Sequence, residues 1–108
     1  MSIQTSDFIQ AAGKWNSTGA GTGAALFEAG GRITTAGAGV YTLTLDQALD
    51  ANEGQVLVQL NGAAAAADLT VTVEDTSDTV KTINVTAAGV ATDSDFGWMA
   101  IKGPNLSL

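Results

Sequence analysis

The chain contains no histidine and no cysteine, and its 108 residues include only four basic side chains and a single proline. Without histidine it lacks the side chain that most often exchanges protons near neutral pH. Without cysteine it lacks a thiol nucleophile and any disulfide, and the two residue types that most often bind transition metals are both missing. We therefore expect no enzyme activity and no cofactor, and we expect packing or oligomerisation to supply the stability.

The charge is strongly one-sided, with 11 acidic residues and a net charge of −7. Four basic residues are too few to neutralise a phosphate backbone or to attract an anionic lipid surface, so we expect neither nucleic acid nor membrane as a partner. No apolar run approaches the roughly 18 residues of a membrane helix, and the first ten residues lack the pattern of a secretory signal. These features predict synthesis and retention in a cytoplasm.

Charged residues make up only 14% of the chain, whereas about 25% is usual in soluble domains. Apolar residues reach 45%. A low charge together with this apolar share suggests that other subunits cover part of the surface.

The dominant pattern is the alternation of apolar and polar residues that is typical of half-buried strands. It occurs in Val40–Leu45, Leu69–Glu74 and Ile83–Thr86. Val56–Leu60 and Phe96–Ile101 are apolar on both faces, which indicates central strands or strands whose outer face meets a partner. Turn-forming residues separate these runs at 37–39, 50–54, 75–78 and 87–89. The pattern predicts an all-β antiparallel sandwich or small barrel of about seven to eight short strands, and it leaves the strand order open.

The chain length predicts a single domain over residues 1–108. Within it, residues 1–30 are rich in glycine and alanine, and we expect them to form an N-terminal arm and edge segment beside a β-sandwich core at 31–108. Two forms of this segment stay open: an arm that becomes ordered against a neighbour, or a surface loop followed by an edge strand. Residues 63–67 are all alanine, and we expect a loop or a single turn there because five residues are too few for a stable helix.

No motif in the sequence carries chemistry. The glycine-rich stretch at 19–23 lacks the spacing of a phosphate-binding loop. The carboxylate pairs Asp75/Asp78 and Asp93/Asp95 lie in turn sequences, where aspartate usually binds nearby backbone N–H groups. Asp93-Ser94-Asp95 and Asp50-x-Asn52 are oxygen clusters but do not match the calcium-binding loop. We therefore predict no catalytic, cofactor-binding or metal-binding residue.

The aromatic residues are expected to serve as core and interface anchors. Phe96 and Trp98 share one face of their predicted strand, which favours the core. Met99 and Ile101 share its other face, where exposed apolar side chains would need to be covered. The residues predicted to contact a partner are Phe8, Ile9, Trp15, Met99 and Ile101. A carbohydrate-binding module that uses an exposed Trp15 or Trp98 is an alternative.

From residue 39 onward the chain resembles the small structural proteins of tailed bacteriophages. The segments that carry this resemblance are GVYTLTL at 39–45, the strand at Val56, DTSDTVK at 75–81 and DSDF at 93–96. The chain is most similar in character to capsid decoration (cement, or head-stabilisation) proteins. The resemblance implies a homotrimer that binds the major capsid protein on the outside of the expanded virion head and bridges capsomers. A head-fibre or tail-fibre adhesion module is the alternative within the same group.

Overall fold

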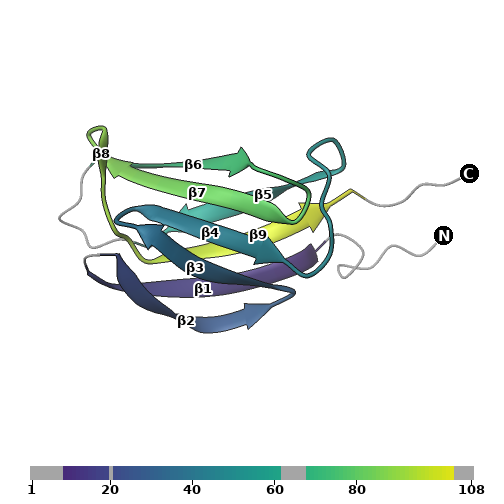
Figure 1. Cartoon of the computed structure of the whole chain (residues 1–108), viewed down its shortest axis with the longest axis horizontal. Coiled ribbons are helices and arrows are strands. Elements are labelled where there is room, and N and C mark those ends of the chain that lie inside the picture. The colour runs from purple at the N-terminus through teal and green to yellow at the C-terminus, as the bar shows by residue number, and fades with distance from the viewer. Residues whose placement is uncertain (1–8, 20, 62–67, 104–108) are drawn as a thin grey trace, which may run out of the picture.

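Two antiparallel sheets form the molecule, and Figure 1 shows them stacked as two layers. The computed structural model describes residues 9–19, 21–61 and 68–103, and this part of the chain contains nine strands and no helix. Accordingly, no helix able to span a membrane occurs in it. The predicted all-β sandwich is confirmed, and the strand order is now defined.

The first sheet, called sheet A, contains in spatial order β2 (Thr22–Ala29), β1 (Ile9–Gly19), β9 (Phe96–Lys102) and β5 (Gly54–Leu60). The second, called sheet B, contains β3 (Gly31–Gly37), β4 (Val40–Leu45), β7 (Val80–Ala87) and β6 (Leu69–Asp75). A two-residue strand, β8 (Val90–Ala91), also pairs with β7.

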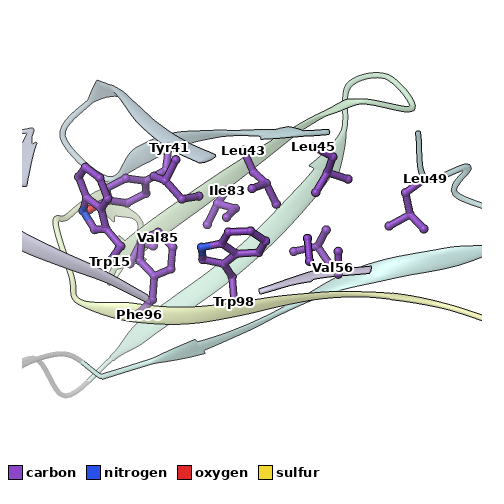
Figure 2. Packing of buried hydrophobic residues seen from close by; sticks show 13 residues of the cluster. Trp15, Tyr41, Leu43, Leu45, Leu49, Val56, Ile83, Val85, Phe96 and Trp98 are labelled. Atoms are coloured by element: carbon purple, nitrogen blue, oxygen red, sulfur yellow. The ribbon is translucent and has the colours of Figure 1, made fainter. Parts of the chain in front are cut away.

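The core lies between the two sheets, and the alternation in the sequence determines which residues enter it. Tyr41, Leu43 and Leu45 of β4 are buried, whereas the threonines between them lie on the opposite face of the strand. Figure 2 shows these side chains packed against residues from sheet A, including Phe96 and Trp98. The rings of Tyr41 and Phe96 meet edge to face, with centroids 4.8 Å apart, an arrangement that aromatic pairs prefer.

The predicted turns join the strands as expected. The turn after Asp75 connects β6 to β7, and residues 38 and 39 connect β3 to β4. Gly39 has a positive φ of 70°, and a Cβ atom there would lie 2.5 Å from the backbone nitrogen of Thr92. Only glycine fits this turn without displacing the loop beside it.

The predicted boundary at residue 31 is wrong for β1. This strand lies between β2 and β9 in sheet A, and its Trp15 is only 5% exposed, so it belongs to the core and not to an arm. β2 is an edge strand, which agrees with one of the two expected forms of this segment. Residues 1–8 and the alanine segment at 63–67 lie outside the described residues.

The two strands that are apolar on both faces occupy different places in sheet A. β9 is central, as one of the two expected options requires, whereas β5 is at the edge. Leu57 of β5 is 44% exposed. The apolar outer faces of both strands thus lie on the surface of this chain.

Candidate interaction surface

The outer face of sheet A, the face turned away from sheet B, is the clearest candidate for a binding surface. Cross-strand pairs share a face of an antiparallel sheet, so the register identifies its residues. One row across the four strands is Ala29, Ala12, Met99 and Leu57, and the next row is Phe27, Lys14, Gly97 and Gln59. A third row contains Ile9, Ile101 and Gln55. Most of these side chains are apolar.

A shallow groove of about 410 Å³ runs across this face. Phe27, Leu57 and Met99 are among its lining residues, and small residues from β1 and β9 lie between them. The groove exists because Gly97 has no side chain: a Cβ atom there would meet nothing closer than the carbonyl oxygen of Gly13, at 3.9 Å. Phe27 is 56% exposed, so one wall of the groove is a largely uncovered aromatic ring.

The strands of sheet A contribute almost no negative charge to its outer face. In its four strands the only acidic residue is Glu28. The carboxylate of Glu28 accepts a hydrogen bond from the backbone N–H of Ile33 in sheet B, at 2.6 Å, and its register position opposite Gly13 places it on the inner face. Lys14 is thus the only charged residue in the rows of the outer face. In a chain with a net charge of −7, these three rows are mostly apolar and carry one positive charge.

Of the five residues predicted to contact a partner, three lie on the outer face of sheet A, one lies in the core and one lies outside the described residues. Ile9, Met99 and Ile101 occupy outer-face positions of sheet A, and Ile9 is 37% exposed. Trp15 was placed wrongly, because its position opposite Phe96 directs it into the core. Phe8 lies outside the described residues. Phe27 and Leu57 were missed, although the apolar run around Leu57 already indicated two buried faces.

The burial of both tryptophans removes the basis of the carbohydrate-binding alternative. Trp15 is 5% exposed and Trp98 is 3% exposed, so neither presents a ring face on which a sugar could stack. Figure 2 shows both indoles directed into the space between the sheets.

Two of the aspartates considered for calcium, Asp93 and Asp95, hold loops together at one end of the sandwich. The carboxylate of Asp93 accepts hydrogen bonds from the backbone N–H groups of Gly21 at 2.7 Å and Gly39 at 2.9 Å. The carboxylate of Asp95 accepts one from the N–H of Ser17 at 2.7 Å. N–H donors surround an anion and repel a cation. In the described part of the chain, no three acidic residues come close enough to bind a metal ion.

The buried Tyr41 and the half-buried Asp93 form the centre of this end. The Tyr41 hydroxyl donates to Asp93 at 3.3 Å and accepts from the N–H of Ser94 at 3.2 Å. Burial would by itself raise the pKa of Asp93, but the hydrogen bonds from Gly21, Gly39 and Tyr41 outweigh it and lower that pKa. Burial raises the pKa of Tyr41. The cluster fixes the 92–95 loop against the turns of both sheets.

Lys81 is a buried cation that was not predicted from the sequence. It lies opposite Leu43 on the inner face of β7 and is 3% exposed. Its ammonium group donates to the carbonyl oxygens of Leu49 at 2.8 Å and Ser77 at 2.7 Å, and it forms an ion pair with Asp75. All three of its protons are thereby used. Lys81 therefore ties the loop between β4 and β5 to the β6–β7 hairpin.

Comparisons with known proteins do not identify a family or a relative for this chain. The chain matches no protein-family model, and neither a curated protein nor a solved structure matches it.

Proposed function

We propose that this chain is a virion structural protein that binds the outer surface of a phage capsid through the outer face of sheet A. The observation that best supports this proposal is a contrast in charge. The chain has a net charge of −7, but the rows of this face contain no carboxylate. Exposed apolar patches of this kind mark interaction sites on soluble proteins. The resemblance to decoration proteins supplies the partner, the major capsid protein.

Such a protein needs no catalytic group. A ligand that binds only the expanded, assembled shell stabilises that shell by mass action. The groove at Gly97 offers a place for an apolar side chain of the capsid protein, and Lys14 beside it offers a partner for a carboxylate. The interface would then combine a buried apolar centre with one polar contact, as stable interfaces commonly do.

The test measures binding to expanded, undecorated heads of the phage that encodes the chain, by co-sedimentation. A Cβ atom at residue 97 would meet nothing closer than 3.9 Å, so Gly97→Val extends into the groove, and we expect it to weaken binding about tenfold or more. Thr72→Val is the matched control, because Thr72 is an exposed residue of β6 opposite Asn84 on sheet B. Circular dichroism and thermal unfolding confirm that both variants fold.

Absence of head binding by the wild-type chain would reject the proposal. Equal weakening by the Gly97 and Thr72 variants would place the contact elsewhere. A fibre or adhesion role predicts a different result, in which removal of the protein leaves the heads stable but abolishes adsorption to the host.

A further inference from the structure

The four edge strands of the two sheets differ in how they are protected against pairing with another chain. Bulges in the β1–β2 register interrupt the edge strand β2, which also carries Glu28. The edge strand β3 carries Arg32, and the backbone N–H of its Ile33 donates a hydrogen bond to Glu28. β6 carries Glu74 and Asp75. Bulges and charged side chains are the usual devices that keep a strand edge from pairing.

β5 has none of these devices. It reads Gly-Gln-Val-Leu-Val-Gln-Leu over Gly54–Leu60, with no charged residue and no proline. Its register with β9 runs through all seven residues without a bulge. Among the described residues, no strand pairs with its other edge. Such an uncharged edge without a bulge is a template for a further strand.

The sequence of β5 indicates which strand would pair with its free edge. Residues 55–59 read Gln-Val-Leu-Val-Gln, which is the same in both directions about Leu57. In an antiparallel pair related by a two-fold axis at Leu57, residue 57 faces itself, 56 faces 58 and 55 faces 59. Every pair in this register matches: leucine with leucine, valine with valine and glutamine with glutamine.

The burial of these side chains agrees with a two-fold pair. Leu57 is 44% exposed in the single chain, and in the pair it would pack against its own copy. Gln55 and Gln59 are exposed on the same face, where their amides would donate to and accept from each other across the two chains. Val58 is only partly buried on the inner face, and Val56 of the other copy would cover it.

We infer that this chain forms a two-fold dimer by antiparallel pairing of β5 with β5 of a second copy. The pairing joins two copies of sheet A into one continuous sheet with both outer faces on the same side. It differs from the homotrimer that the resemblance implies. It also places two docking faces side by side, so that a dimer would bind a repeating lattice more tightly than one chain does.

A charge-exchange pair of variants tests the register. Gln55→Lys with Gln59→Lys places lysine opposite lysine at both ends of the ladder, and we expect this variant to be monomeric. Gln55→Lys with Gln59→Glu places lysine opposite glutamate at both ends, and we expect a dimer at least as stable as that of the wild type. Sedimentation velocity over a concentration series from about 1 µM to 1 mM suits a small interface of this kind.

The series should show the wild-type mass rising from 10.8 kDa toward twice that value. The lysine–lysine variant removes net negative charge from an acidic protein, so a nonspecific effect of charge would increase its association and not reduce it. Wild type that stays monomeric at the highest concentration overturns the inference. Equal dimerisation of the two double variants, or a trimer that responds to neither, also overturns it.

Disulfide trapping gives an independent readout, because the chain has no cysteine of its own. Leu57→Cys places two thiols directly opposite each other, within the range that a disulfide spans. Gln55→Cys places its two thiols about 13 Å apart, four residues out of register. Oxidation should therefore cross-link the Leu57 variant and not the Gln55 variant, and the reverse result would refute the register. These assays contain no phage heads, so a failed dimer leaves the docking proposal standing, and failed head binding leaves the dimer standing.

Discussion

The buried ammonium of Lys81 provides the sharpest test of how the two sheets are held together. Lys81→Met keeps an unbranched side chain that is one atom shorter, but it removes the charge and all three donors. The carbonyl oxygens of Leu49 and Ser77 and the carboxylate of Asp75 then lose this partner. Hydrogen bonds from a charged donor contribute about 1.5–3 kcal/mol each, and loss of one member of a buried pair costs about 3–5 kcal/mol.

The side chain of Asp75 is 42% exposed, so water takes over part of its interaction when the lysine is removed. Allowing for this, we expect Lys81→Met to lower the free energy of unfolding by about 2–3 kcal/mol. In a domain of this size, that loss corresponds to a fall in Tm of roughly 10–20 °C. Asp75→Asn is the matched comparison. It keeps one acceptor oxygen but removes the charge, and we expect it to cost less than about 1 kcal/mol.

Urea unfolding followed by tryptophan fluorescence measures both variants, because Trp15 and Trp98 are buried and become exposed on unfolding. The midpoint should fall for Lys81→Met while the m-value stays unchanged. If Asp75→Asn costs as much as Lys81→Met, the ion pair dominates and the carbonyl contacts contribute little. If Lys81→Met costs less than about 1 kcal/mol, the ammonium does not hold the β4–β5 loop in place.

Three further predictions concern the core and the Asp93 cluster. Because hydrogen bonding lowers the pKa of Asp93 in the folded state, its stabilisation is present above its ordinary pKa and is lost as pH falls through the folded value. Asp93→Asn should therefore lower Tm at pH 7, and the difference from wild type should shrink below about pH 4. Tyr41 is the only tyrosine, and its pKa is raised in the folded state. Stability should therefore fall as pH rises above 10.0, and the ultraviolet absorbance of Tyr41 should change at a higher pH than that of a free tyrosine. An absorbance change at the pH of free tyrosine would refute this. Gly13→Ala places a Cβ atom 2.5 Å from Nε1 of Trp98 and should cost about 1–3 kcal/mol in urea unfolding, whereas Gly97→Ala should be neutral or stabilising.

The strands of the C-terminal part of the chain follow from the sequence because their alternation is regular. The pattern over Val40–Leu45 predicts β4 at the same bounds, and the turn sequence at 75–78 predicts the β6–β7 hairpin. Residues 9–30 could not be placed in this way. Glycine and alanine dilute the alternation there, and the role of Gly13 depends on the indole of Trp98, which comes from the far end of the chain.

Part of the candidate surface, Phe27 and Leu57, and the buried cation Lys81 could not be predicted from the sequence, for a related physical reason. A lysine that follows a valine in a strand looks like a solvated residue until the loop carrying Leu49 folds over it. The apolar character of Leu57 was visible in the sequence, but its position at an edge depends on the strand order, which period-two alternation does not specify. Local patterns thus determine the strands, whereas long-range pairing determines which of their faces remain open.

The distribution of acidic residues connects the fold to association. Within the described residues, only Glu28, Glu74 and Asp75 lie in strands, and the remaining acidic residues lie in turns and loops. Glu28 and Asp75 each bind a group of sheet B. Turns collect at the two ends of a sandwich, so both ends are negative and repel the ends of other copies. Contacts between ends are therefore disfavoured, whereas the edge of β5 and the rows of the outer face of sheet A carry no carboxylate that would oppose association.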